Sequence, residues 1–252
     1  MEQCITSKAN PRFKDLLASL RATGPSRVRT LVAGEKLIET WRAAPHAGRL
    51  APESLWMMEG RETTQSLHEL HLPVQWLSEK LMADLCDSGS PPSCALLLRL
   101  GLEPAGPLKN RVIVPWGIQD PGNLGAIFRS AAAFGFQEAL LGPGCADPFS
   151  PKALRGSMGA AFLLAIRRIE TLELGPGNWF ALDGGPDAIA LKDANLAEPL
   201  RILVGNEGHG WKHESLPAGV QRVAIPTLGV GSLNAAVAAG IACFEAQRRV
   251  IA

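Results

Sequence analysis

The sequence lacks the features that mark membrane, secreted and metal-binding proteins. No apolar run reaches the ~18 residues that a membrane-spanning helix needs, and the opening stretch, MEQCITSKANPRFK, has no apolar core of the kind found in a secretory signal. The 5 cysteines are scattered and never spaced C-x-x-C. This usage argues for reduced thiols and against a disulfide framework or a zinc site. We therefore expect a cytoplasmic protein without a membrane segment or a metal.

Three common catalytic motifs are also missing. There is no G-x-x-x-x-G-K-[ST] P-loop, and residues 155–159, Arg-Gly-Ser-Met-Gly, lack the first glycine of a hydrolase elbow. The loop at 229–234, G-V-G-S-L-N, has Asn234 where a dinucleotide-binding fingerprint needs its third glycine. The acidic residue expected about 20 positions further on is missing too. These departures disfavour a P-loop nucleotidase and a Rossmann dehydrogenase.

Charge is nearly balanced overall but uneven along the chain. The formal net charge is +1, yet the segment 8–29 carries one acid, Asp15, among a cluster of basic residues. These basic residues are Lys8, Arg12, Lys14, Arg21, Arg27 and Arg29. Such a cluster can contact phosphates, and it can equally be the solvated face of a helix.

The length of 252 residues fits one large domain or two smaller ones. Residues 1–100 alternate between helical and strand patterns, which predicts a small α/β domain. Its first helix, expected over 10–22, places Phe13, Leu16, Leu17 and Leu20 on one face. Residues 101–109 hold two glycines and two prolines without periodicity, and we interpret them as a linker to a second domain over 110–252.

The second domain has the pattern of a mainly parallel sheet covered on both faces. Its sequence predicts alternating strands and helices. The strands are expected at 111–116, 138–142, 201–204 and 222–226, and the helices at 124–134, 147–159, 187–195 and 232–249. Ser232 is the expected N-cap of the last helix. Leu233, Val237, Ile241 and Phe244 form the apolar side of that helix.

Three loops that combine glycine with polar residues follow three of these strands. They are residues 120–123 with the nearby Arg129, residues 205–210, and residues 228–234. Asn123 and Arg129 would point about 120° apart on one helix, so they can share a site only if Asn123 lies in the entering turn. Glu207 lies where open parallel sheets bind ligands, although it could instead cap the backbone of its own loop. Three such loops together predict one composite pocket.

A histidine pair in the second loop is a weak candidate for metal binding. His209 and His213 are four residues apart, with Glu207 and Glu214 beside them. Glycines flank His209, however, and disfavour the regular helix that a shared metal would need. We interpret His209 as a loop residue.

The three loops resemble the signature motifs of the SpoU (TrmH) family of RNA 2′-O-ribose methyltransferases in the SPOUT superfamily. They do so both in their order along the chain and in their residues. The matching stretches are DPGNLGAIFRSAAAFG, LVGNEGHG and IPTLGVGSLNAAVA, and the similarity covers residues 110–252. DPFSPKALRGSMGA resembles the ribosomal-RNA branch of the family. NPRFKDLLASLR and LVAGEKLIETW are similar to the ribosomal-protein-like RNA-binding domain that precedes many catalytic domains of the family.

The resemblance implies a C-terminal trefoil knot in the parallel-sheet domain, a homodimer formed through that knotted domain, and S-adenosylmethionine as methyl donor without a metal. The positions that match cofactor-binding residues are Leu203, Gly205, Asn206, Gly208, Ile225, Leu228 and Leu233. The positions that match catalytic residues are Asn123, Arg129, Glu207, Ser232 and Asn234. Thr227 and Leu228 depart from the usual third motif, as do Ala235 and Ala236, so we expect the adenosine contacts to differ there.

The implied reaction is transfer of a methyl group to a ribose 2′-hydroxyl, with ribosomal RNA as the expected substrate and the basic first helix holding phosphates. Arg129 is the candidate base or the clamp on the adjacent phosphate, and a guanidinium pKa above ~12 favours the clamp. Asn123 and Asn234 would orient the ribose, and Glu207 would hold the loop or Arg129. The alternatives are a transfer-RNA methyltransferase, a base methyltransferase, and a non-catalytic RNA-binding or ribosome-assembly factor.

Overall fold

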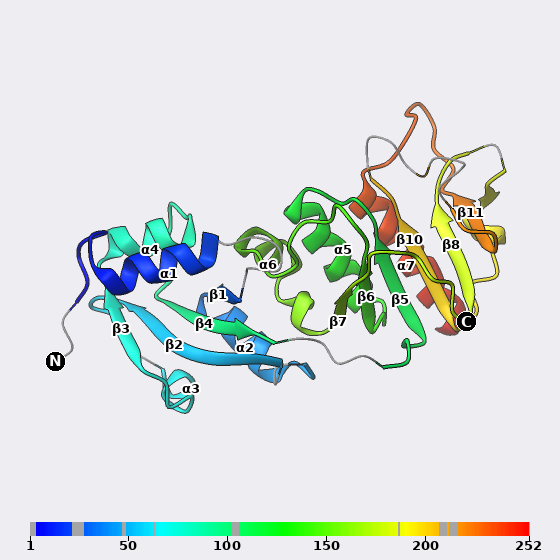
Figure 1. Ribbon diagram of the computed structural model, residues 1–252. Helices are drawn as coiled ribbons and strands as arrows, with labels where there is room; N and C mark the ends of the chain where they lie inside the picture. The colour runs from blue at the N-terminus through cyan, green and yellow to red at the C-terminus, as the bar shows by residue number, and fades with distance from the viewer. Residues whose placement is uncertain are drawn as a thin grey trace. The chain divides into compact units, whose positions relative to one another are not determined.

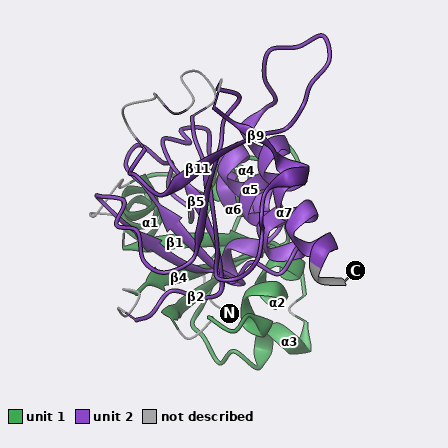
Figure 2. Cartoon of the chain, turned by 90° about the vertical axis from the view of Figure 1, so that its right-hand side faces the viewer, with its two compact units in different colours: residues 1–102, 149–151 green, residues 103–148, 152–252 purple. Residues whose placement is uncertain are grey.

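The computed structural model describes residues 4–21, 28–46, 49–62, 64–101, 106–185, 187–206, 211 and 216–251 (Figure 1). The chain divides into two compact units, coloured separately in Figure 2. Unit 1 comprises residues 1–102 with 149–151, and unit 2 comprises residues 103–148 with 152–252. None of the described helices is long and apolar enough to cross a membrane.

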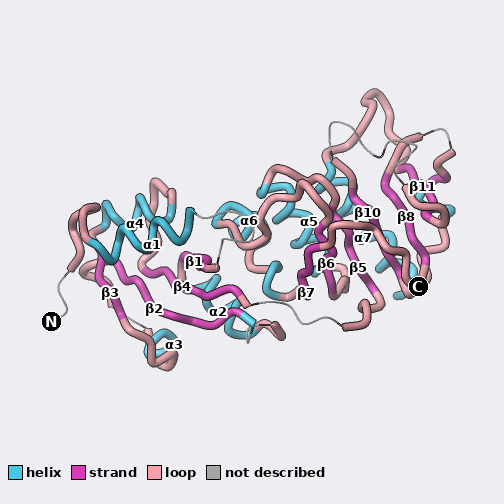
Figure 3. Tube along the Cα trace, viewed as in Figure 1, coloured by secondary structure: helices cyan, strands magenta, loops and turns pink. Residues whose placement is uncertain are grey.

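Unit 1 is a four-stranded sheet with helices, and its elements alternate along the chain (Figure 3). The elements are α1 (Pro11–Arg21), β1 (Arg29–Ala33), α2 (Glu35–Ala43), β2 (Leu50–Met58), α3 (Gln65–His68), β3 (Val74–Leu77), α4 (Glu79–Cys86) and β4 (Cys94–Leu100). The strand order is β1-β4-β2-β3, with β4 antiparallel to both neighbours and β2 parallel to β3.

The predicted first helix is confirmed. Phe13 and Leu16 are buried in the core of unit 1, and Leu17 and Leu20 pack against that core. Asn10 begins the helix by accepting a hydrogen bond from the Arg12 backbone N–H at 2.9 Å. The apolar face of α1 therefore fastens the helix to the sheet, and its charged residues lie on other faces.

Unit 2 is built on a seven-stranded sheet, and every strand pair described in it is parallel. The strand order is β7-β6-β5-β10-β8-β11-β9. The strands are β5 (Arg111–Pro115), β6 (Glu138–Leu141), β7 (Ala165–Arg168), β8 (Asn178–Leu182), β9 (Ile189–Ala190), β10 (Leu200–Val204) and β11 (Val220–Ala224). The helical elements are α5 (Pro121–Ala133), α6 (Pro151–Ser157), η3 (Ala160–Phe162), η4 (Leu191–Asp193) and α7 (Ala235–Ile251). The expected α/β class with a parallel sheet is confirmed.

The sheet brings the predicted loops to one edge. Val204 at the end of β10 pairs in register with Pro115 at the end of β5 and with Leu182 at the end of β8. Leu182 in turn pairs with Val223 of β11, the strand that precedes the third loop. The carboxyl ends of these parallel strands therefore lie together, and the segments that follow them begin at the same edge. This edge positions the candidate site.

Several predicted element bounds in unit 2 are wrong, each for a local reason. The helix expected over 147–159 covers only Pro151–Ser157, because proline suits a first helical position and the left-handed backbone at Met158 ends the helix. The segment 187–195 forms the short strand β9 and a 3₁₀ turn, because Ile189 and Ala190 pair with β11. The last strand covers Val220–Ala224 rather than 222–226.

Candidate functional site

The first polar loop leads directly into α5. Asp120 is the N-cap, and its Oδ1 accepts a hydrogen bond from the Asn123 backbone N–H at 2.9 Å, while Pro121 occupies the first turn. The helix thus begins three residues earlier than expected from the sequence, and Asn123 lies in its first turn. The side-chain hydrogen bond from Lys152, followed by the one from the Asn123 backbone, lowers the pKa of the Asp120 carboxyl.

Small residues let α5 lie close to its neighbours, as the sequence indicates. A Cβ on Gly125 would lie 2.5 Å from the Ala153 carbonyl oxygen in α6. On the neighbouring helix α7, a Cβ on Gly240 would lie 3.2 Å from the Ser130 Oγ of α5. The backbone of α5 is therefore fixed by close packing, and this packing positions Asn123.

The first and third loops meet through two asparagines. Asn234 donates from Nδ2 to the Asn123 Oδ1 at 3.3 Å. The Asn234 Oδ1 also accepts from the backbone N–H groups of Ala236, at 2.9 Å, and Val237, at 3.2 Å. Asn234 is therefore the N-cap of α7, and the expected cap at Ser232 is wrong. Because the cap uses the Oδ1 of Asn234, its Nδ2 faces Asn123.

The second loop joins the first through Asn206. Its Nδ2 donates to the Gly117 carbonyl oxygen at 2.8 Å. The backbone supports the same junction, since the Trp116 N–H donates to the Val204 carbonyl oxygen at 2.9 Å. Asn206 thus bonds to the segment between β5 and the first loop, and the Asn123–Asn234 hydrogen bond joins the first loop to the third.

Two tryptophans that the sequence analysis did not single out pack at this edge. The rings of Trp116 and Trp211 lie 5.8 Å apart between centroids and are tilted by 47°. Trp211 is buried, with 7% exposed, and its Nε1 has no hydrogen-bond partner among the described residues. A Cβ on Gly205 would lie 2.8 Å from that Nε1, so glycine is required at this position. Only Trp116 directly follows a strand end, so no local sequence pattern pairs it with Trp211.

The third loop presents side chains outward. Leu228 is 98% exposed and Val230 is exposed, as is Ser232. Thr227 Oγ1 donates to the Val230 carbonyl oxygen at 2.9 Å, and Gly229 between them has a φ of 80°. The loop is thus a defined turn with apolar side chains and a hydroxyl on its surface.

Arg129 lies on α5 with its side chain exposed. It makes no hydrogen bond or ion pair with the part of the chain that the structure describes. An exposed guanidinium on a rigid helix is available to an anionic ligand that approaches from outside.

The remaining predicted site residues differ in burial. Leu203 is fully buried in the core beneath the edge, so only its backbone could contact a ligand. Ile225 and Leu233 are half-buried. Glu207 and Gly208 lie outside the described residues, as do His209 and His213. Within the described ranges, no group of three or more His, Cys, Asp or Glu residues is placed to hold a metal ion.

In a parallel α/β domain, polar loops joined at the carboxyl edge of the sheet are the usual place for a ligand-binding site. Comparison with known proteins identifies the family of this domain. Residues 110–244 match the model of the SpoU rRNA Methylase family. An uncharacterized tRNA/rRNA methyltransferase of Synechocystis sp. is 36% identical over 139 residues, which are 52% of this chain and 51% of that protein.

Two solved structures are similar over almost the whole chain. An RNA 2′-O ribose methyltransferase is 29% identical, with a TM-score of 0.79 over 99% of this chain and 100% of that one. An AdoMet-bound rRNA methyltransferase from Sinorhizobium meliloti is 24% identical and shares the fold, with a TM-score of 0.84 and 99% of each chain covered.

The chain spans about half the length of the first curated relatives that it matches. The family model covers more than half of the chain. The chain therefore belongs to the SpoU rRNA methylase family.

Proposed function

We propose that the chain is an S-adenosylmethionine-dependent RNA methyltransferase that modifies a ribose 2′-hydroxyl, with ribosomal RNA as its substrate. The observation that carries the proposal is the hydrogen bond between Asn123 and Asn234. This contact joins two of the three stretches that resemble the family's signature motifs, although the residues are 111 positions apart. The 2′-hydroxyl target is supported by the 29% identical RNA 2′-O ribose methyltransferase.

The sheet edge fits a cofactor with an aromatic base, an apolar chain and polar ends. Leu228 and Val230 offer apolar surface, and Gly229 and Gly231 leave space where a Cβ would meet no atom within 4 Å. The Trp211 Nε1 is a buried donor without a partner among the described residues. In this proposal S-adenosylmethionine is held by Gly205, Asn206, Ile225, Leu228 and Leu233, and it supplies a methyl group already activated on a sulfonium.

The protein must then orient a poor nucleophile. A ribose hydroxyl attacks only when it is aligned with the methyl carbon and when its proton can leave. Asn123 and Asn234 offer amide groups at the ends of two helices, where they can hydrogen-bond the ribose. The Ser232 hydroxyl is exposed beside them in sequence and can do the same.

Arg129 is assigned to the phosphate next to the target ribose. A guanidinium stays protonated in proteins and binds phosphate oxygens through two parallel hydrogen bonds. Its exposure on α5 suits contact with a large RNA. The phosphate clamp is therefore favoured over a role for Arg129 as the base.

A homodimer through unit 2 is part of the proposal. Val237 is 51% exposed and Phe244 is 52% exposed on α7, with Ile241 between them. The residues of α7 that are buried within the chain are others, namely Ala239, Ala242, Cys243 and Ala246, and of the exposed row Phe244 also meets the ring of Phe134. An apolar row on the outer side of a C-terminal helix is typical of a surface covered by a partner, and a second copy of the chain would cover it.

The experiment is methyl transfer from radiolabelled S-adenosylmethionine to transcripts of ribosomal RNA and transfer RNA. We expect label in ribosomal RNA that makes the neighbouring phosphodiester resistant to alkali and stays with the ribose after glycosidic cleavage. Label that leaves with the base would contradict the 2′-hydroxyl target, and preferential labelling of transfer RNA would contradict the substrate. Calorimetry without heat on adding S-adenosylmethionine would indicate a non-catalytic RNA-binding protein.

A further inference from the structure

Helices α5 and α7 of unit 2 lie side by side and run in the same direction (Figures 1 and 2). The candidate site lies at their N-terminal ends, where Asn234, the N-cap of α7, donates to Asn123 in the first turn of α5. Toward their C-terminal ends, the rings of Phe134 and Phe244 lie 5.7 Å apart between centroids. The two helices are therefore parallel, with the site at one end of the pair.

Packing alone determines the position of α7 along its axis only weakly. Where α7 passes α5, a Cβ on Gly240 would lie 3.2 Å from the Ser130 Oγ. Small side chains form shallow ridges and grooves, so they resist sliding along a helix axis less than large ones do. Hydrogen bonds, whose lengths and angles are narrowly bounded, can fix the position instead. Up to Arg249, the buried residues of α7 are all small, namely Ala235, Ala239, Ala242, Cys243 and Ala246.

Arg111, at the start of β5, makes such hydrogen bonds at the far end of both helices. Its side chain is only 6% exposed, and its Nε donates to the Glu198 Oε1 at 2.6 Å. Its Nη1 donates to the carbonyl oxygen of Phe134, the C-cap of α5, at 3.0 Å, and also to the Gln247 Oε1 of α7. One guanidinium nitrogen therefore joins the end of α5 and the end of α7 to the sheet.

Gly135 leaves the space for this junction. Its φ is 79°, and a Cβ there would lie 3.3 Å from the Arg111 Nη1 and 3.4 Å from the Gln247 Oε1. A larger residue would adopt an unfavourable backbone conformation and would press on both groups. The chain therefore turns away after α5 in a way that lets the guanidinium reach both helices.

A shift of α7 at this junction would be felt at the candidate site. Gln247 and Asn234 are about 20 Å apart along the helix at 1.5 Å per residue, and an α-helix moves as a stiff body over that length. The Asn123–Asn234 hydrogen bond is 3.3 Å long. Lengthening it by about 0.3 Å would take it outside hydrogen-bond range. The contact therefore tolerates little sliding.

We propose that Arg111 and Gln247 are positioning residues for methyl transfer. By fixing α7 along α5 at the end away from the site, they hold the Asn234 amide against Asn123. The inference rests on the proposed function, in which these two asparagines orient the ribose. Misplacing an orienting group by about 1 Å can lower a rate about 100-fold, so a hydrogen bond remote from the site can set the rate.

The test is Gln247→Leu in the full chain, which removes the acceptor and leaves the other contacts of Arg111 in place. We expect kcat for methyl transfer to fall about 3- to 10-fold, while KM for RNA stays within about 2-fold. Arg111→Lys keeps the charge but cannot donate in a fork to several acceptors, so it should give a similar loss. Gln247→Glu keeps an acceptor for Arg111, and its kcat should stay within about 2-fold of wild type.

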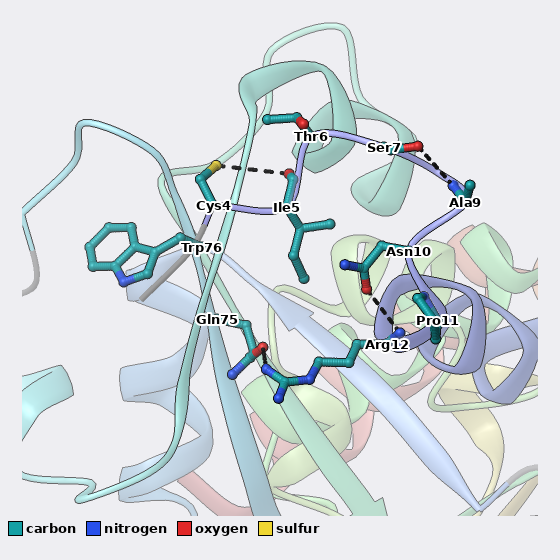
Figure 4. A pocket seen from close by; sticks show the side chains of 10 residues that line it. All are labelled: Cys4, Ile5, Thr6, Ser7, Ala9, Asn10, Pro11, Arg12, Gln75 and Trp76. Carbon is teal, nitrogen blue, oxygen red and sulfur yellow. Dashed lines mark hydrogen bonds between the residues drawn. The ribbon is translucent and has the colours of Figure 1, made fainter. Parts of the chain in front are cut away.

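Unit 1 offers a matched control, because it contains a second hydrogen bond from an arginine to a glutamine. The Arg12 Nη1 donates to the Gln75 Oε1 at 2.9 Å in a recess of about 780 Å³ (Figure 4). Gln75→Leu removes the same kind of acceptor, and kcat at saturating RNA should stay within about 2-fold of wild type. Equal losses in Gln247→Leu and Gln75→Leu would overturn the proposal.

A double-mutant cycle separates positioning from general stability. Asn234→Asp has already lost the donor to Asn123, so adding Gln247→Leu should lower kcat less than about 2-fold further. Two effects that multiply would show that Gln247 acts independently of Asn234, and would overturn its positioning role. Thermal melting and sedimentation velocity check that each variant keeps its fold and its oligomeric state.

Nuclear magnetic resonance tests the geometry without any activity. The side-chain amide resonances of Asn123 and Asn234, assigned through Asn123→Asp and Asn234→Asp, should shift in Gln247→Leu and stay unchanged in Gln75→Leu. Unshifted resonances would overturn the positioning role whether or not the chain is a methyltransferase. Shifted resonances with an unchanged kcat would overturn its part in the reaction. If the resonances shift as expected while the wild type transfers no methyl group to any RNA, only the proposed function fails.

Discussion

Arg129 and Asn234 contribute to the candidate site in different ways. Arg129 is exposed and makes no hydrogen bond or ion pair with the described part of the chain, so replacing it should not disturb the fold. The Asn234 side-chain amide makes two kinds of contact. Its oxygen caps α7, and its nitrogen donates to Asn123. The two positions therefore require different substitutions.

Arg129→Ala is expected to lower methyl transfer by at least about 100-fold, because the phosphate beside the ribose loses its clamp. The affinity for S-adenosylmethionine should stay within about 2-fold, since the proposed cofactor residues lie on other loops. Tritium transfer and calorimetry measure the two quantities, with Lys36→Ala on α2 as the control. Full activity of Arg129→Ala would refute its role.

Asn234→Asp separates the cap from the contact. A carboxylate oxygen can still accept from the backbone of α7, so the melting temperature should not fall. The donor to Asn123 is lost, and activity should fall at least about 10-fold. Asn234→Ala should lose the same activity and also about 1 kcal/mol of stability. If Asn234→Asp is fully active, the Asn123–Asn234 hydrogen bond has no functional role.

At the scale of elements, the sequence predicted best where a pattern is local. The first helix, Pro11–Arg21, and the strand Leu200–Val204 are found close to their expected bounds, because each follows a local pattern of apolar residues. The start of α7 was misplaced because Ser232 and Asn234 are both good caps. The choice of Asn234 agrees with its contact to Asn123, which lies far away in the sequence. The Trp116–Trp211 pair is a long-range contact of the same kind.

Asp120 stabilises the first turn of α5, and this contribution depends on pH. Asp120→Ala should cost about 1 kcal/mol near neutral pH through loss of the N-cap. The hydrogen bond from Lys152 lowers the pKa of Asp120 in the folded chain. The stabilising effect is therefore present above the unfolded pKa of about 3.9 and is lost as pH falls through the lower folded value. Chemical unfolding of both proteins from neutral pH down to about pH 2.5 should show stability curves that converge only in acid.

Gly125 tests the packing of α5 against α6. Gly125→Ala places a methyl group 2.5 Å from a backbone oxygen, so the two helices must separate. We expect a loss of about 1–3 kcal/mol, although alanine favours helix formation. Gly89→Ala is the control, because its Cβ would meet no atom within 4 Å. A Gly125 variant as stable as the control would show that α6 moves away without cost.

At the scale of the whole molecule, the exposed row on α7 predicts self-association. Phe244→Glu should convert a dimer to a monomer in sedimentation velocity, because a buried carboxylate without a partner is strongly unfavourable. Lys36→Glu in unit 1 is the control for a change of charge. The ring of Phe244 also lies 5.7 Å from that of Phe134 between centroids, so melting should be compared in both variants. A wild-type monomer would refute the dimer.

The tryptophan pair at the sheet edge also gives the chain an intrinsic optical signal. Two indole rings 5.8 Å apart and tilted by 47° have coupled electronic transitions, and such coupling produces paired bands of opposite sign in circular dichroism. The bands depend on Trp116 and Trp211 remaining in contact. Their amplitude therefore reports the integrity of this edge in solution, in the absence of any RNA or added label.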